Sequence, residues 1–92
     1  MLHVQEQYGE AAAFYRQSLA LCRDVGDLVG QATALGNLGE VAQIEGRYAE
    51  ARTSYAEALA IGRAIQNQWN MMTNLNNLGE TATVLEIGRA HV

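Results

Sequence analysis

The sequence predicts an all-α protein of about four helices, folded as antiparallel helical hairpins that stack side by side into a solenoid. Three observations predict this class. The stretch Thr33–Ala42 returns forty residues later as Thr73–Ala82. Apolar residues recur at spacings of three and four, which is the period of one face of a helix. The chain contains no proline, so its composition does not interrupt long helices.

The repeat is visible along most of the chain. Residues 8–45 align with residues 48–85 without a gap, and 14 of the 38 pairs are identical. The identical residues of the first copy are Tyr8, Glu10, Ala11, Tyr15, Leu19, Ala20, Arg23, Thr33, Leu35, Asn37, Leu38, Gly39, Glu40 and Ala42. A period of this length is typical of stacked supersecondary units, each of which needs its neighbours to bury a core.

We expect the first helix at residues 8–25, with residues 1–7 forming the end of a truncated preceding helix. Its apolar stripe is Ala11, Tyr15, Ser18, Leu19, Cys22 and Val25. Gly26 can adopt the left-handed conformation that closes a helix. Asp27 can then accept a hydrogen bond from the first amides of the next helix.

The remaining helices are expected at residues 28–45, 48–65 and 68–85. Gly46 ends the second helix, and Asn67 takes the capping place of Asp27. Connections of about two residues force successive helices to run antiparallel. The three inward stripes are Leu28, Ala32, Leu35, Leu38, Gly39 and Ala42; Ala51, Tyr55, Ala58, Leu59, Gly62 and Ile65; and Met72, Leu75, Leu78, Gly79 and Ala82.

Gly39 and Gly79 lie in the middle of their helices, where each glycine costs about 1 kcal/mol relative to alanine. A locally costly residue that recurs needs a packing reason. We expect Ala51 to face Gly39, with the larger Tyr55 filling space one turn further on, because helices interlock when small residues meet large ones.

The pattern breaks at residues 86–92, where Glu86-Ile87-Gly88 replaces the Gly46-Arg47-Tyr48 of the earlier turn. The codons ATC GGA AGA GCA CAC GTC would encode Ile87–Val92, and they spell the start of a common sequencing adapter. We therefore expect a non-native tail on a fragment translated from an environmental read; the alternative is a genuine frayed terminus. Such scars are left out of fold reasoning.

Composition excludes several classes of function. The net charge of −4 and the singly scattered arginines argue against a nucleic-acid surface. A single cysteine and two distant histidines provide no metal site, and no nucleophile–base pair or phosphate loop indicates an enzyme. We expect no cofactor. Lacking a signal-peptide pattern or an apolar run of membrane-spanning length, the chain is expected to be cytoplasmic and not membrane-bound.

The Leu38-Gly39 pair, followed at set intervals by Ala51, Tyr55 and Ala58, resembles the tetratricopeptide repeat. The forty-residue spacing and the Gly-Asn-Leu-Gly motif resemble the longer-repeat branch of that family. The resemblance covers residues 8–85 and implies a right-handed superhelix whose A helices line a concave groove. Residues 8–25 would be helix B of a partial repeat, residues 28–65 one complete repeat, and residues 68–85 a lone helix A.

Identities on the other face of the A helices suggest function. Thr33, Asn37 and Glu40 point away from the packing stripe and recur as Thr73, Asn77 and Glu80, with Gly36 and Asn76 beside them. In the resembled family this face lines the groove, where asparagine could bond the main chain of an extended peptide and the glutamates would favour basic side chains. The open alternatives are an Asn37–Asn77 hydrogen-bonded ladder and a recent duplication.

The favoured function is a protein–protein interaction scaffold, part of a longer array that binds a peptide or protein segment in the groove formed by Thr33, Gly36, Asn37, Glu40, Thr73, Asn76, Asn77 and Glu80. The alternative is a structural spacer or oligomerisation repeat of a larger bacterial regulator, with no groove ligand. Leu75, Leu78 and Ala82 have no following helix to cover them. We therefore expect marginal stability and self-association through the last helix.

Overall fold

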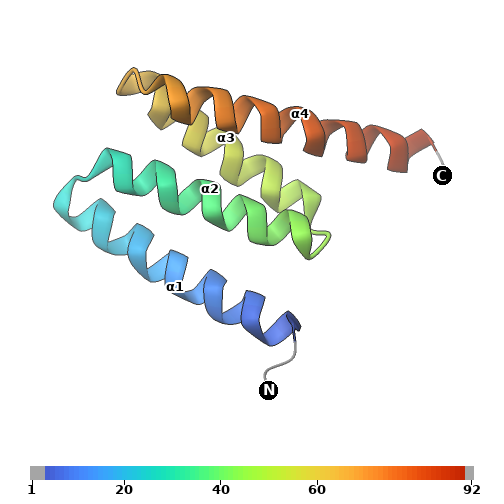
Figure 1. Ribbon diagram of the computed structural model, residues 1–92, viewed down its shortest axis with the longest axis horizontal. Helices are drawn as coiled ribbons and strands as arrows, with labels where there is room; N and C mark the ends of the chain where they lie inside the picture. Colours follow the sequence, from blue (N-terminus) through green and yellow to red (C-terminus); the bar gives the residue numbers. More distant parts are fainter. Residues whose placement is uncertain (1–3, 91–92) are drawn as a thin grey trace.

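The computed structural model describes residues 4–90 as four α-helices joined by short turns (Figure 1). They are α1 (Val4–Val25), α2 (Leu28–Ile44), α3 (Tyr48–Ala64) and α4 (Gln68–Ala90). Successive helices pack against each other, and α2 also touches α4. The described part of the chain contains no strand. The predicted all-α architecture of stacked helical hairpins is confirmed.

The two outer helices run further than the repeat pattern predicts. α1 begins at Val4, so the break expected before Tyr8 is not there and residues 4–7 continue the same helix. α4 likewise runs past residue 85 to Ala90. The reason is the same at both places, because Glu6 and Glu86 occupy the position at which Gly46 turns the chain. Residues 1–3 and 91–92 lie outside the described residues.

The three turns share one hydrogen-bonding pattern. In each turn, the amide of the residue just before the next helix donates to the carbonyl five residues earlier. The pairs are Asp27 to Cys22 at 2.8 Å, Arg47 to Ala42 at 2.8 Å, and Asn67 to Gly62 at 2.9 Å. This is the Schellman closure, which requires a left-handed residue just before. The predicted caps are confirmed, since Asp27 accepts from the Gly30 amide and Asn67 accepts from the Asn70 amide.

Two of the three left-handed positions are glycines, Gly26 with φ of 75° and Gly46 with φ of 81°. The third is Gln66, with φ of 56°. A side chain in this region places its Cβ too close to the following carbonyl oxygen, which costs roughly 1–2 kcal/mol. The α3–α4 turn is therefore the strained member of the set.

We predict that Gln66→Gly raises the free energy of unfolding by about 1 kcal/mol, because it removes this strain at a small entropic cost in the unfolded chain. Urea denaturation followed by circular dichroism measures the change. The reverse substitution, Gly26→Gln, should lower stability by a similar amount. Equal midpoints for the Gln66→Gly and parent chains would contradict the strain.

The core lies where α2 meets α3. Tyr55 is completely buried and packs with Ala42 and Ala51, while Leu35 and Ala58 form a neighbouring cluster with Leu19 of α1. The sequence predicts Ala51 opposite Gly39, with Tyr55 one turn further on. The structure corrects this: the Tyr55 ring itself covers Gly39, and a Cβ at Gly39 would lie 2.6 Å from its Cε1 atom.

A second pair of contacts shows small and large residues exchanged between the two copies. In the α1–α2 hairpin Cys22 packs against Gly30, where a Cβ would lie 2.5 Å from the Cys22 Sγ atom. In the α3–α4 hairpin the glycine is on the other helix, and Gly62 makes room for Asn70. Total volume at the contact is preserved, as close packing requires.

Most of the stripe expected to face inward on α4 is exposed, and only Leu78 packs against the Tyr55 cluster as predicted. Leu75 is 51% exposed and Met72 67%, whereas the equivalent Leu35 is 4% and Ala32 1% exposed. Gly79 has no atom within 4 Å of a would-be Cβ. The difference arises because α3 covers this face of α2, whereas no described helix covers the equivalent face of α4. Val25 and Leu28, also expected inward, lie exposed beside the first turn.

The two mid-helix glycines therefore form a matched experiment. Gly39→Ala should destabilise the fold by about 1–2 kcal/mol, because overpacking against the buried Tyr55 ring outweighs the gain in helix propensity. Gly79→Ala, in open space, should stabilise it by up to about 1 kcal/mol. Chemical denaturation at low protein concentration distinguishes them, and shifts of the same sign would refute the packing account.

Candidate partner-binding groove

A hollow of about 140 Å³ lies between α2 and α4. It brings together residues that are about forty positions apart in the sequence, and six of the eight predicted site residues line it. The lining residues are Ala32, Thr33, Gly36, Asn37, Glu40, Asn70, Thr73, Asn74 and Asn77. The Thr33, Asn37 and Glu40 positions of α2 thus share one hollow with Thr73 and Asn77 of α4.

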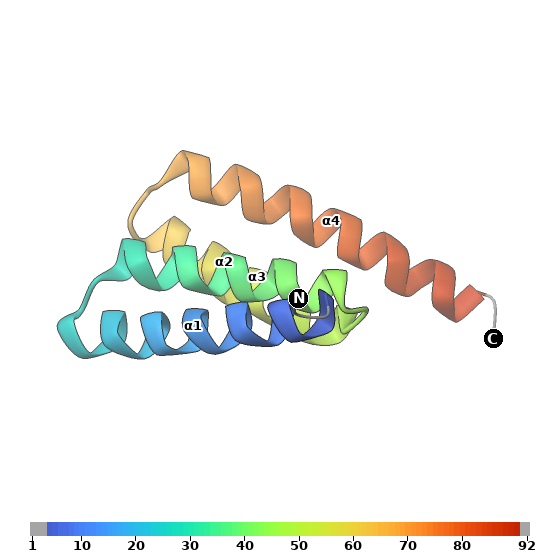
Figure 2. The same ribbon diagram turned by 60° about the horizontal axis from the view of Figure 1, so that its bottom comes forward.

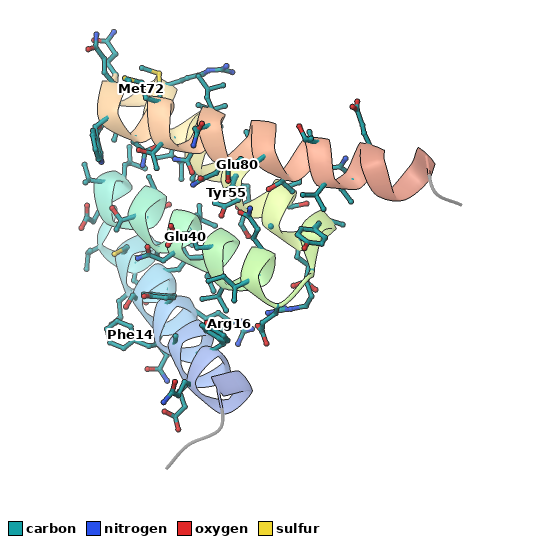
Figure 3. All side chains as sticks on the ribbon, turned by 45° about the vertical axis from the view of Figure 1, so that its right-hand side comes forward. Phe14, Arg16, Glu40, Tyr55, Met72 and Glu80 are labelled. Atoms are coloured by element: carbon teal, nitrogen blue, oxygen red, sulfur yellow. The ribbon has the colours of Figure 1, made fainter. Side chains whose placement is uncertain are left out.

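A second, wider hollow of about 480 Å³ continues toward the other end of the two helices. It shares Glu40 and Asn77 with the first, so the two form one groove along α2 and α4. Glu80, the seventh predicted residue, lines this part together with Ile44 and Val84. Figure 3 shows Tyr55 between α2 and α4, with Glu40 and Glu80 nearby on those two helices.

Asn76, the eighth predicted residue, lines neither of these two hollows. It is exposed on the side of α4 that carries Leu75 and Gly79, and it lines a third depression that borders the wider hollow at Glu80 and Val84. One residue corresponds to a rotation of about 100° around a helix, so neighbouring Asn76 and Asn77 face different directions. Of the two, Asn77 is the asparagine that the fold turns toward α2.

The hydrogen bonds of the groove differ from the ladder considered as an alternative. Among the residues that the structure describes, no hydrogen bond joins Asn37 to Asn77. The Thr33 hydroxyl donates to the Val29 carbonyl of its own helix at 2.9 Å. The asparagine side chains that do bond each other are Asn70 and Asn74, both on α4. The two amides of Asn37 and Asn77 keep their donors and acceptors for other partners.

Asn74 carries an unsatisfied acceptor at the floor of the groove. The residue is 2% exposed, and its amide nitrogen donates to the Asn70 carbonyl at 2.8 Å and to Asn70 Oδ1 at 3.0 Å. Both partners are acceptors, which fixes the orientation of the amide. Its Oδ1 atom is buried without a partner. An orphaned buried carbonyl is costly, so this oxygen needs a donor from outside the described residues.

Gly36 lies next to that oxygen. A Cβ at Gly36 would lie 3.7 Å from Asn74 Oδ1, so a larger side chain there would close over it. Sequence analysis selected Gly36 but missed Asn70 and Asn74. The repeat could not reveal them, because Gly30 and Ala34 occupy the same positions in the first copy. The signal that could have revealed Asn74 is a polar residue at the position where the first copy has the apolar Ala34.

Tyr55 joins the groove to the core. Its hydroxyl donates to Gln43 Oε1 on α2 at 2.9 Å. Burial, together with the negative charges of Glu40 and Glu80, raises the pKa of Tyr55 to about 12. Both effects disfavour the phenolate. The two glutamates that flank the groove therefore act on one buried hydroxyl from two helices, and the groove carries negative potential.

We predict that Tyr55 makes stability fall at alkaline pH. The pKa of tyrosine is about 10 in an unfolded chain, below its value in the fold. The unfolded state therefore releases this proton first as pH rises. The stabilisation is complete below pH 10 and is lost between pH 10 and pH 12, by on the order of 2–3 kcal/mol.

Urea unfolding measured at intervals from pH 9 to pH 12 tests this. Tyr55→Phe cannot ionise and should lose this part of the pH dependence, although it starts from lower stability without the Gln43 hydrogen bond. Tyr48→Phe is the matched control and should retain the full decline. An unchanged decline in Tyr55→Phe would show that other groups cause it.

Stacked antiparallel hairpins with a polar groove along alternate helices define an α-helical repeat protein. The sequence profile described as tetratricopeptide repeat matches residues 1–64 and again residues 30–86, so the chain belongs to the tetratricopeptide repeat family. Such repeats are generally protein–protein interaction modules and are typically not enzymes. The forty-residue branch stays a prediction. A search of curated proteins finds no match to the chain.

Within the described part of the chain, every helix is too short or too polar to form a transmembrane span. No three histidine, cysteine, aspartate or glutamate residues within it lie close enough together to hold a metal ion. The cytoplasmic location stays a prediction.

Proposed function

We propose that the groove between α2 and α4 binds an extended segment of a partner protein that carries basic side chains. The observation that supports this most directly is the unpartnered Asn74 Oδ1 at the floor of a hollow lined by residues of both helices. Membership of a family of interaction modules supports it as well.

The lining chemistry suits a peptide main chain. Asn37 and Asn77 each offer two donors and an acceptor, which can pair with the carbonyl and amide groups of an extended segment. Asn74 Oδ1 accepts a donor that reaches past Gly36. Main-chain pairing of this kind holds the segment without reading its sequence, as in other modes of peptide recognition.

Charge adds a preference among segments. Glu40 and Glu80 line the groove, and the residues of both hollows include no arginine. Arg47, the arginine nearest to Glu40 in the sequence, already pairs with Glu45 and Glu50. An arginine of the partner can therefore meet the two carboxylates without competition from a lining cation, and charge-assisted bonds of this kind are the stronger ones.

The test is selection of peptides from a displayed random library on the parent chain, followed by calorimetric titration of the enriched sequences. We predict that Asn37→Ala combined with Asn77→Ala weakens binding at least about tenfold, since each lost hydrogen bond contributes about 1 kcal/mol. Enriched peptides should carry arginine. Glu40→Gln combined with Glu80→Gln should weaken binding and reduce its dependence on salt.

Asn76→Ala is the matched control, because it removes the same side chain from the same helix outside the groove. It should bind as the parent does, and circular dichroism should show that all variants are folded. Peptides that bind the Asn37→Ala, Asn77→Ala variant unchanged would place the site elsewhere. Failure to enrich any peptide would favour the alternative role as a spacer.

A further inference from the structure

The exposed face of α4 repeats a face of α2 that is covered. Four residues of α2 lie where α3 packs, and the same four residue types occupy the equivalent places on α4. They are Leu35, Leu38, Gly39 and Ala42 on α2, and Leu75, Leu78, Gly79 and Ala82 on α4. On α4 most of this face is open: Leu75 is half exposed and no atom lies near a would-be Cβ at Gly79, while Leu78 packs against the Tyr55 cluster of the same chain.

The opposite end of the molecule carries the complementary helix. α1 aligns with α3, and its Ala11 and Tyr15 correspond to Ala51 and Tyr55, which cover α2. α1 packs on α2 through Leu19, which joins Ala34 and Leu35 of α2 in one buried cluster. Tyr15 is only partly buried, unlike Tyr55, and its ring meets Phe14 edge to face at 5.8 Å. Its helix has no described partner equivalent to α2.

We propose that a second copy of this chain covers α4, with α1 of one copy packing on α4 of the next as α3 packs on α2. Tyr15 of one copy then lies on Gly79 of the other, repeating the Tyr55–Gly39 contact. The interface is a continuation of the stacking already present within the chain. In this assembly, α4 of one copy and α2 of the next copy lie relative to each other as α2 and α4 lie within a single chain. The row of polar groove residues therefore continues from one copy to the next.

The register of the internal contact fits the ends of the outer helices. Within the chain, Gly39 pairs with Tyr55 across two antiparallel helices. Their counterparts in the other repeat copy are Gly79 and Tyr15, which would form the equivalent pair between two molecules. Counting outward along both helices places Ala90 opposite Val4, which are the last residue of α4 and the first of α1. The two helical extensions would lie side by side.

This contact is head-to-tail, because each copy contributes two different faces. Figures 1 and 2 show α1 and α4 at opposite edges of the molecule, with α2 and α3 between them, and α1 and α4 do not touch. A heterologous contact of this kind leaves a free face at each end, so it builds open chains instead of closing into a symmetric dimer.

The interface is expected to be weak. A single helix-on-helix contact lies at the low end of interface sizes, where association is typically transient. The match with the internal contact is also incomplete, since Ser18 stands in place of Ala58 and Thr83 in place of Gln43, which accepts the Tyr55 hydroxyl. Assembly should therefore be visible only at high concentration.

Sedimentation of the 92-residue chain across a wide concentration range tests the proposal, which does not depend on the proposed groove function. We expect the average mass to rise steadily with concentration. Gly79→Ala should lower the association constant at least about tenfold, because its Cβ occupies the site of the Tyr15 ring. The same variant should gain monomer stability, so lost assembly cannot be attributed to misfolding.

Gly9→Ala is the matched control. Gly9 also has open space around it, and its counterpart Ala49 is exposed and outside the α2–α3 core clusters. This variant should assemble as the parent chain does. A parent chain that stays monomeric at every concentration, or a Gly79→Ala chain that assembles equally well, would overturn the proposal.

A mixing experiment determines the geometry. Tyr15→Ala and Gly79→Ala each damage one of the two faces, so neither should assemble alone. Mixed together they retain one intact pair of faces, α1 of the Gly79→Ala copy and α4 of the Tyr15→Ala copy, and should form dimers that grow no further. Assembly of Tyr15→Ala by itself would indicate a symmetric α4–α4 contact and would refute the head-to-tail arrangement.

Discussion

The contact between the Tyr55 ring and Gly39 determines how the two central helices meet. The ring can approach the α2 backbone this closely only because Gly39 has no Cβ, and the Tyr55 side chain is buried completely. Its hydroxyl reaches across to Gln43, which holds α3 at one height along α2. α4 in turn packs on α3 where Asn70 meets Gly62, so α3 determines the distance between α2 and α4. The groove exists because α3 spaces the two helices that line it.

The exchange of volume between the two hairpins explains why the floor of the groove is polar. A cysteine against a glycine fills the α1–α2 contact, and a glycine against an asparagine fills the α3–α4 contact. Moving the larger residue to helix A places Asn70 where its side chain and main chain both accept from Asn74. That pair points the remaining Asn74 oxygen toward Gly36. A packing solution thereby supplies a hydrogen-bonding group that faces the groove.

Local signals predicted most of the fold. The periodic apolar residues indicated four helices, and Asp27 and Asn67 were correctly identified as caps. The outer ends of α1 and α4 were not predicted, because the repeat suggested a turn where the chain has glutamate. Which face of α4 is buried depends on a neighbouring helix, and no pattern within α4 contains that information. The groove positions that recur could be named in advance, whereas Asn74 could not, since its environment arises from three helices together.

Residues that recur in both copies, but in different surroundings, help to separate packing from contact with a partner as reasons for the recurrence. Leu75 keeps the identity of Leu35 although no described helix covers it, so contacts within the described residues do not account for its recurrence. Asn37 and Asn77 keep one identity and also line the same hollow. A recent duplication would preserve neighbouring positions equally well, yet several residues of the same stretch have diverged. These are Ala34 and Asn74, Gly36 and Asn76, Val41 and Thr81, and Gln43 and Thr83. The retained residues lie on both faces: Leu35, Leu38, Gly39 and Ala42 on the packing face, and Thr33, Asn37 and Glu40 on the groove face. Packing accounts for the first set, and the proposed contact with a partner would account for the second.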